Sequence, residues 1–260
     1  MRYILLHKGI VMAIENILNE FAVSFTKKID PEYYFTVQLE FTDISDNNIW
    51  QLDIKNKNVV IYDKEIIKPE ETYLLTVNTL EKLYNNELSS LTAFLQGPNE
   101  KGIMCSLIGI KNKKEENRFW DGDKLEQEKL DFFNRSHIFT SGFFNRFYPT
   151  KVMVDNKYSI KHNNVNAIGL YSDFKNGTLH VYFSVKANEV LHYPPIDCSI
   201  FVLHGKGKLK LDGNEYDIQE NEYYHLMPQK NMSFENKENI SLEIIFMGNA
   251  KRYKNKYKTR

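Results

Sequence analysis

Short runs in which apolar and polar residues alternate dominate the chain from residue 150 onward. They include VNAIGLY, TLHVYFSV, CSIFVL, KLKLD and SLEIIFM, and turn sequences such as Lys-Asn-Gly and Asp-Gly-Asn separate them. Side chains of a β-strand point alternately to its two faces, so each run predicts a strand with one buried face. Strands that recur at intervals of about 8–12 residues are typical of a sandwich or a barrel. The sequence therefore predicts an all-β domain at 150–250.

The first 110 residues show a different pattern. Apolar residues recur every three or four positions between 10 and 28, which predicts an amphipathic helix. Four strand-like runs follow, at 35–41, 49–54, 58–62 and 72–77. Two short helices are expected in TLEKLYNNEL, with Asn78 as its cap, and in SSLTAFLQ. Helices and strands segregated in this way favour an α+β fold, with helices on one face of a mainly antiparallel sheet.

Charge and cysteine content limit the function classes. Lys and Arg together number 34, as do Asp and Glu, so the net formal charge is zero. Non-specific electrostatic binding of nucleic acid requires a basic face, and the sequence does not predict one. Two cysteines far apart, Cys105 and Cys198, fit a reducing compartment better than a disulfide framework. No stretch approaches the ~20 apolar residues of a membrane span, so we predict a cytoplasmic protein.

The two parts are joined by residues 111–149, which we interpret as a connector. Residues 111–118, KNKKEENR, form a charged run that predicts a solvated loop. A helical segment and the Phe-dense HIFTSGFFNRFYP (137–149) follow. Aromatic side chains favour burial, so packing between or under the domains is expected, with lipid contact as the alternative. The basic segment 251–260 is predicted to be a solvated tail.

Residues 10–110 resemble the sterol carrier protein family of small lipid-binding α+β domains. The resemblance is carried by the opening helix, by FTVQLEF and IWQLDI, and by TYLLTVNTLEKLYNNELSSLTAFLQG. In the last stretch, family members show a strand, a Thr-Leu helix start and a turn. After AFLQG they continue with a Lys-rich strand, whereas this chain reads PNEKGIMCSLIG. The resemblance implies an apolar cavity that holds a lipid.

The predicted ligand-binding residues of this domain are apolar. They are Trp50, Leu52, Leu91, Phe94, Leu95 and Met104. Ligand cavities are mostly apolar with few polar groups, which fits this set. The alternative is that these side chains simply fill a core, because buried apolar side chains usually do.

Residues 150–248 resemble the cupin family of jelly-roll barrels. VLHGKGKLKLDG and NEYYHLMPQKNMSFEN carry the resemblance. Family members usually bind a divalent metal through a His-x-His pair, a Glu and a later His. Aligned on that pattern, His192 matches the first His, while Pro194, Cys198 and Ser233 stand at the other three positions. A divalent site normally takes three or more protein ligands, so we predict no metal and no cofactor. A homodimer through this domain is implied by the resemblance alone.

Three functions stay open at this level. We favour non-catalytic binding of a lipid or other long apolar ligand by the first domain, with the cupin domain as a second pocket, sensor or dimerisation module. An enzyme with an unusual His192/Cys198 site is the first alternative, and it requires polar groups that converge inside 165–247. A structural or regulatory protein with both cavities closed is the second. No catalytic residue is predicted, because no phosphate loop, nucleophile elbow or C-x-x-C occurs. The ligand-binding residues predicted in the second domain are His180, Tyr182, His192, Cys198 and His225.

Overall fold

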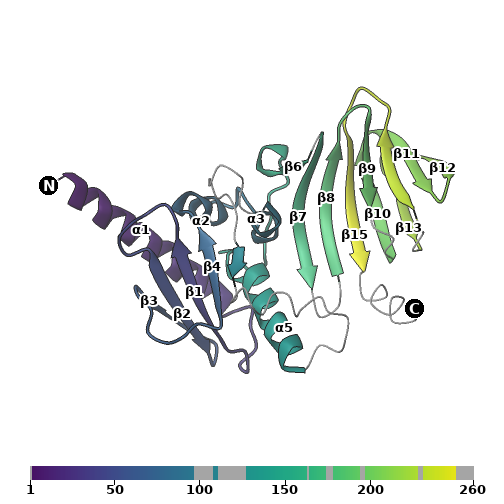
Figure 1. The fold of residues 1–260 in the computed structure, drawn as a ribbon. Coiled ribbons are helices and arrows are strands. Elements are labelled where there is room, and N and C mark those ends of the chain that lie inside the picture. Colours follow the sequence, from purple (N-terminus) through teal and green to yellow (C-terminus); the bar gives the residue numbers. More distant parts are fainter. Residues whose placement is uncertain are drawn as a thin grey trace. The chain divides into compact units, whose positions relative to one another are not determined.

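The chain divides into two compact units, residues 1–153 and 154–260 (Figure 1). The computed structural model describes residues 2–96, 108–110, 127–162, 164–173, 178–193, 197–227 and 231–249. Within those residues, no helix is both long and apolar enough to cross a membrane. The first unit combines helices with one mixed sheet, and the second consists almost entirely of strands.

The first unit is built on a five-stranded sheet in the order β3-β2-β1-β4-β5. Its strands are β1 (Phe35–Phe41), β2 (Ile49–Lys55), β3 (Asn58–Tyr62), β4 (Glu71–Leu75) and β5 (Ile108–Ile110), and its helices are α1 (Arg2–Phe25), α2 (Val77–Tyr84), α3 (Ser90–Gln96) and α5 (Gln127–Gly142). Strand β1 runs parallel to β4, whereas the other neighbouring pairs are antiparallel. The prediction of a mainly antiparallel sheet with helices is therefore confirmed.

One face of this sheet forms the core with the helices. Alternate residues of β1, namely Phe35, Val37, Leu39 and Phe41, are fully buried. Helix α1 contributes the stripe Ile14, Leu18, Phe21 and Phe25. Helix α5 contributes Phe132 and Phe139, and the segment directly after it contributes Phe143 and Phe144. The rings of Phe139 and Phe143 stack with centroids 4.8 Å apart. The Phe-dense segment predicted as a connector thus packs into the core of the first unit.

The opposite face of the sheet is partly closed by the segment between β3 and β4. Gln51 is fully buried there, and its amide oxygen accepts hydrogen bonds from the backbone N–H groups of Ile66 and Ile67 at 2.9 and 3.0 Å. Its side-chain nitrogen donates to the carbonyl of Ile67 at 2.5 Å. A single amide therefore fixes this segment against the sheet.

Helix α2 begins earlier than the sequence predicts. Thr76 is the N-cap, and its side chain accepts a hydrogen bond from the N–H of Thr79 at 3.0 Å. The expectation that Asn78 is the cap is wrong, because Asn78 already lies inside the helix. The carboxylate of Asp43 accepts the N–H of Val77 at 3.0 Å, which satisfies a further free donor of the first turn.

The second unit consists of two antiparallel sheets. One has the order β13-β10-β15-β8-β7-β6 and the other β12-β11-β14-β9. The strands are β6 (Ile160–His162), β7 (Val165–Asp173), β8 (Thr178–Val185), β9 (Glu189–Tyr193), β10 (Asp197–His204), β11 (Lys206–Leu211), β12 (Asn214–Gln219), β13 (Tyr223–Leu226), β14 (Met232–Asn236) and β15 (Leu242–Asn249), preceded by a short 3-10 helix, η1 (Asn156–Tyr158). The all-β prediction for this part of the chain is confirmed.

Apolar side chains from both sheets fill the interior of the sandwich. Phe183, Phe246 and Ile200 come from the larger sheet, and Leu209 and Phe234 come from the smaller one. Gly207 allows close packing here, because a Cβ at that position would lie 2.6 Å from Leu242 Cδ2 and 2.7 Å from the carbonyl oxygen of Glu235.

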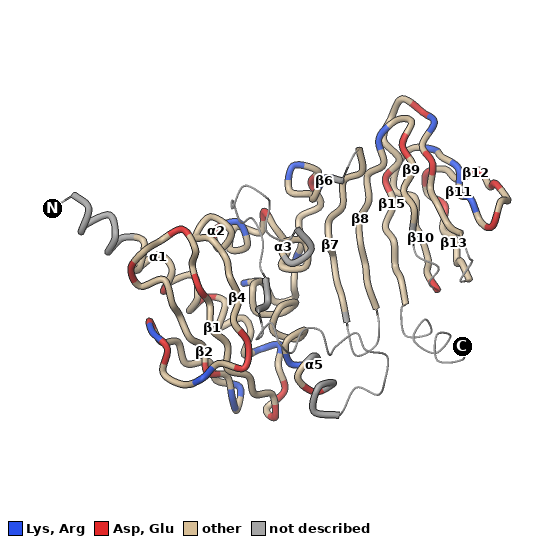
Figure 2. The backbone as a smooth tube through the Cα atoms, viewed as in Figure 1, with Lys and Arg blue, Asp and Glu red and all other residues tan. Residues whose placement is uncertain are grey.

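The two outer faces of the sandwich differ in charge. On the smaller sheet, Lys208 pairs with Asp217 at 2.5 Å, and Lys210 pairs with Glu215 and Glu235 at 3.0 and 2.7 Å. On the larger sheet, two cross-strand rows contain no Lys, Arg, Asp or Glu. They are Tyr171, His180, Met247, Ser199 and His225, and beside them Ile168, Tyr182, Ile245, Phe201 and Tyr223. Figure 2 shows charged residues along β11 and β12 and few along β7 and β8.

Candidate functional site

A groove of about 700 Å³ lies on the surface of the first unit. One wall is formed by Asn19, Glu20, Val23 and Ser24 of α1 and by Lys27 just beyond its end, and the other is formed by residues 146–148. The α1 residues recur at helical spacing, on the side of the helix that does not enter the core. Its volume falls in the usual range of small-molecule sites, about 300–1,000 Å³.

Exposed apolar side chains form much of this groove. Val23 is 61% exposed and Tyr148 is 65% exposed, and Phe147 lies beside them. Large apolar side chains exposed together in a concave surface are typical of binding sites. An apolar ligand that covers Val23 and Tyr148 would remove both from water.

The polar rim of the groove is centred on Arg146. Its guanidinium lies 4.3 Å from the ring centroid of Tyr84 and 5.1 Å from that of Phe147, which are cation–π distances. Glu20 lies 3.9 Å away, and its carboxylate accepts the hydroxyl of Tyr84 at 2.8 Å. That hydrogen bond raises the pKa of Tyr84. The Nε of Arg146 is buried and has no hydrogen-bond partner among the described residues.

The wall formed by 146–148 is fixed in place by neighbouring polar groups. Lys28 Nζ donates hydrogen bonds to the carbonyls of Gly142 and Asn145 at 3.0 and 2.6 Å. Asn145 accepts the N–H of Phe147 through its side chain at 3.0 Å and donates to the carbonyl of Lys151 at 2.7 Å. Burial lowers the pKa of Lys28 to about 8. The groove is therefore largely preformed.

The interior residues predicted for the first domain lie away from this groove. Trp50 and Leu52 are fully buried on the helix side of the sheet, and Leu91 is half-buried on α3. The indole N–H of Trp50 finds no hydrogen-bond partner among the described residues. The side chains of Phe94 and Leu95, and all of Met104, lie outside the described residues.

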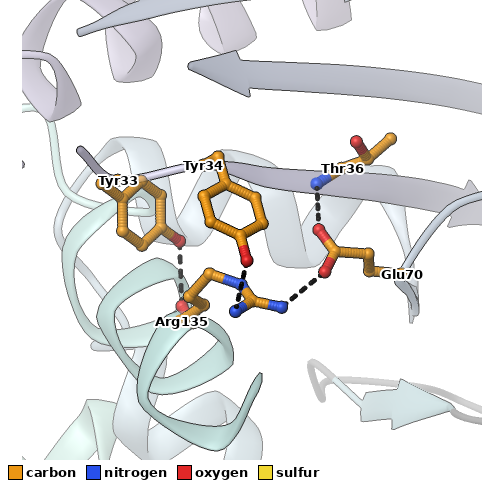
Figure 3. A network of polar contacts seen from close by, with 5 residues as sticks. All are labelled: Tyr33, Tyr34, Thr36, Glu70 and Arg135. Atoms are coloured by element: carbon orange, nitrogen blue, oxygen red, sulfur yellow. Dashed lines mark hydrogen bonds and ion pairs between the residues drawn. The ribbon is translucent and has the colours of Figure 1, made fainter. Parts of the chain in front are cut away.

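A polar network joins α5 to the sheet of the first unit (Figure 3). Arg135 pairs with Glu70 at 2.6 Å and donates to the hydroxyl of Tyr34 at 3.2 Å. Glu70 also accepts the N–H of Thr36 at 3.1 Å, and the hydroxyl of Tyr33 donates to the Arg135 carbonyl at 2.9 Å. Because these contacts tie together three segments of the unit, we interpret the network as a structural clamp.

A second buried contact lies near this clamp. The hydroxyl of Tyr73 donates to the carboxylate of Glu71 at 2.5 Å and lies 3.0 Å from the Oγ of Ser136 on α5. Burial, followed by the Glu71 charge, raises the pKa of Tyr73. The hydroxyl therefore stays protonated and adds a further link between β4 and α5.

The structure does not bring the predicted residues of the second domain together. Cys198 points into the sandwich core, where burial raises the pKa of its thiol to about 12, with Asp197 as a smaller cause. His192 is exposed on the outer face of the smaller sheet. His180 lies on the outer face of the larger sheet beside Tyr171, with ring centroids 5.4 Å apart. His180 and His192 thus occupy opposite outer faces.

Tyr182 also points outward from the larger sheet, although it is buried. Burial is the main cause that raises its pKa to about 12, and the carboxylate of Glu243 adds to it. Among the described residues, no three His, Cys, Asp or Glu side chains gather at a distance suited to a shared metal ion. The described interior of 165–247 is lined mainly by apolar side chains.

Asp197, Ser199, Tyr223 and His225 form a polar cluster in the second unit. Of these residues, the sequence predicted only His225 as a site residue. The Oγ of Ser199 lies 3.2 Å from His225 Nδ1 and accepts the hydroxyl of Tyr223 at 2.7 Å. Asp197 Oδ1 lies 3.7 Å from His225 Nε2. Alternation offered a signal, because positions 197 and 199 face outward when Cys198 and Ile200 face the core.

Comparisons with known proteins give weak similarities. No protein-family model matches the sequence, and no curated protein matches it. Among solved structures, a cupin 2 conserved barrel domain protein from Salinispora arenicola is 14% identical, with a TM-score of 0.35, over 43% of this chain and 98% of that one. The cupin_2 domain of an XRE family transcriptional regulator from Enterobacter cloacae is 12% identical, with a TM-score of 0.31, over 33% of this chain and 95% of that one.

A cupin-2 domain from Rhodospirillum rubrum is 16% identical, with a TM-score of 0.32, over 36% of this chain and 68% of that one. Similarities of this kind fall on roughly the C-terminal 40% of the chain. They carry no inference about ligand or activity.

Proposed function

We propose that the first unit is a binding module for a small, mainly apolar molecule such as a lipid. The observation that carries this proposal is the preformed groove in which Val23 and Tyr148 stay exposed. Burying apolar surface stabilises a complex by roughly 25 cal/mol per Å², or about 0.8 kcal/mol per CH₂. A ligand with several methylene groups therefore gains affinity without a catalytic group.

The resemblance to the sterol carrier family supports the same class of ligand. That resemblance rests on the sequence of residues 10–110 alone and stays a prediction. A site lined by Trp50, Leu52 and Leu91 stays a prediction. It requires a ligand to enter a region that is now packed with side chains.

For the second unit we propose a non-catalytic module of cupin type that acts as a sensor or as a dimerisation surface. Its uncharged outer rows support a contact role, because interface cores are poor in charged residues and rich in aromatic residues and Met. The enzyme alternative depends on His192 and Cys198, but Cys198 points into the core whereas His192 lies on the outer face of the smaller sheet.

The test is native mass spectrometry of the full chain purified without detergent or chelator, followed by titration with a dansyl-labelled fatty acid. We expect an adduct of a few hundred daltons that organic solvent removes. Val23→Asp should weaken probe binding by at least tenfold, because a carboxylate then enters the apolar wall. Met12→Asp is the matched control, since Met12 is 62% exposed on the same helix but does not line the groove.

Equal weakening by both substitutions would contradict a specific role for the groove. If Val23→Asp leaves probe binding unchanged, the ligand binds elsewhere, and the interior site near Trp50 and Leu91 becomes the candidate. No binding of the probe and no adduct would contradict the proposed function itself.

A further inference from the structure

The segment that follows α5 forms a short loop with an exposed tip. Asn145 is buried and holds both ends of this loop, because its side chain accepts the N–H of Phe147 at 3.0 Å and donates to the carbonyl of Lys151 at 2.7 Å. Residues 148–150, which lie between these two contacts, are all exposed, and Tyr148 is 65% exposed. One buried amide therefore presents an aromatic side chain at the surface of the first unit.

Basic side chains flank the tip of the loop. The guanidinium of Arg146 lies 5.1 Å from the ring centroid of Phe147, and Lys151 Nζ lies 5.5 Å from the same centroid. The sequence contains no Asp or Glu between residues 132 and 154. The loop thus combines cations and aromatic rings without a carboxylate of its own.

The end of α1 extends this surface. Val23, which is 61% exposed, and the exposed Lys27 line the same groove as Tyr148. Of the described residues that line the groove, Glu20 alone is acidic, and its carboxylate lies 3.9 Å from Arg146. The exposed apolar side chains are therefore surrounded by more positive than negative charge.

We infer that Val23, Lys27, Arg146, Tyr148 and Lys151 form a docking surface for an anionic phospholipid bilayer. Each Lys or Arg close to such a bilayer strengthens binding roughly fivefold. Tyrosine rings lie at the headgroup level of membranes, because one end of the ring is apolar and the other is polar. Protein partners require shape complementarity, whereas a fluid bilayer adapts to an exposed loop tip.

This docking surface does not require a ligand in the groove, because the side chains that form it are already exposed in the chain alone. It shares Val23 and Tyr148 with the groove. Docking on a bilayer therefore places the groove against a source of apolar molecules. Membrane binding and ligand binding nevertheless stay separate properties, which can be measured one at a time.

The test is co-sedimentation of the full-length chain with vesicles of phosphatidylcholine, with and without phosphatidylserine. No fatty acid is added, so the result is independent of the ligand proposed for the groove. We expect binding to the vesicles that contain phosphatidylserine, and a loss of that binding as NaCl is raised, because salt screens exposed charges. Lys27→Gln and Lys151→Gln should each weaken binding roughly fivefold, and the double variant roughly 25-fold.

Matched controls separate the docking surface from the rest of the first unit. Tyr148→Ser should weaken vesicle binding roughly tenfold, because the apolar part of the ring is lost. Ile67→Ser, at a position 49% exposed in the segment between β3 and β4, should leave binding unchanged. Lys64→Gln, in the same segment, is the control for the two lysine variants. All these side chains are exposed, so each variant should stay folded, which thermal unfolding checks.

Equal binding to both kinds of vesicle, or no binding to either, would overturn the inference. So would a double variant Lys27→Gln/Lys151→Gln that binds as the natural chain does, or a loss in Lys64→Gln as large as that in Lys151→Gln. In each of these cases the dansyl-labelled fatty acid can still bind the groove, so the proposed function is judged by its own titration.

Discussion

The ammonium of Lys28, just after α1, lies 2.6 Å from the carbonyl oxygen of Asn145 and 3.0 Å from that of Gly142, where α5 ends. A cation at the end of a helix satisfies carbonyls that lack intrahelical partners and complements the helix dipole. One side chain therefore joins α1 to the segment that forms the second wall of the groove.

This contact predicts an unusual pH dependence of stability. Burial lowers the pKa of Lys28 to about 8 in the folded protein, from 10.5 in the unfolded chain. Between these values the unfolded chain binds more protons, so the free energy of unfolding gains a contribution that rises with pH. The neutral amine keeps two N–H groups, enough for both carbonyls.

Urea unfolding at pH 7 and at pH 9.5 tests this expectation. The natural chain should gain stability relative to Lys28→Met as the pH rises through this window. Other titrating groups cancel because both proteins share them. A constant difference between the two proteins at both pH values would contradict the assignment.

The clamp formed by Arg135 and Glu70 predicts a specific requirement for arginine. Arg135→Lys should lower the free energy of unfolding by about 1–3 kcal/mol, because one ammonium cannot serve both Glu70 and Tyr34 in the same geometry. Lys55→Ala is the control, since its pair with Asp53 is exposed and should contribute little. Equal losses in chemical denaturation would show that the clamp is no more than a surface ion pair.

The aromatic core predicts that α5 is an integral part of the first unit. Phe139 is fully buried and contacts the rings of Phe25, Phe35 and Phe143. Phe139→Ala should cost about 3–5 kcal/mol through the lost burial and the cavity left behind. Ile138→Ala, one residue earlier and 41% exposed, should change stability little. The prediction fails if the two variants unfold at the same denaturant concentration.

Burial of the Cys198 thiol predicts that it reacts slowly with thiol reagents in the folded protein. With a pKa raised to about 12, it carries almost no thiolate at pH 8. In a Cys105→Ser background, a thiol reagent should label Cys198 only after denaturant is added. Rapid labelling of the folded protein would contradict the burial.

Substitutions at Cys198 and His192 also test whether the second unit takes part in lipid binding. The double variant His192→Ala/Cys198→Ala should bind the dansyl-labelled fatty acid as the natural chain does, because neither residue belongs to the first unit. Loss of probe binding in a protein that is still folded would contradict the proposed division of labour.

Local patterns made the strands and helices of both units predictable. Alternation in FTVQLEF fixed which residues of β1 enter the core, and the stripe from Ile14 to Phe25 fixed the buried face of α1. Each of these two buried faces can be predicted from the sequence of a single segment. The cap of α2 was assigned wrongly because Thr76 and Asn78 are both good capping residues, and their backbone conformations decide between them.

Long-range features could not be predicted in this way. The parallel pairing of β1 with β4 and the insertion of Phe139 and Phe143 into the first core depend on contacts between distant segments. The same holds for the groove, and for the meeting of Asp197 with His225, which requires the register between β10 and β13. The periodicity of a segment predicts the face to which a side chain points, but the residues that it contacts depend on how the strands pair.

The unlike outer faces of the sandwich make the second unit respond to ionic strength in two opposite ways. Dissolved salt screens exposed pairs such as Lys208–Asp217, whose attraction falls as the Debye length shortens. Strongly hydrated salts such as sulfate favour the burial of uncharged surface such as Phe201 and Tyr223. Raising sulfate is therefore expected to weaken the ion pairs within the face of the smaller sheet and to favour any contact that buries the uncharged rows of the larger sheet.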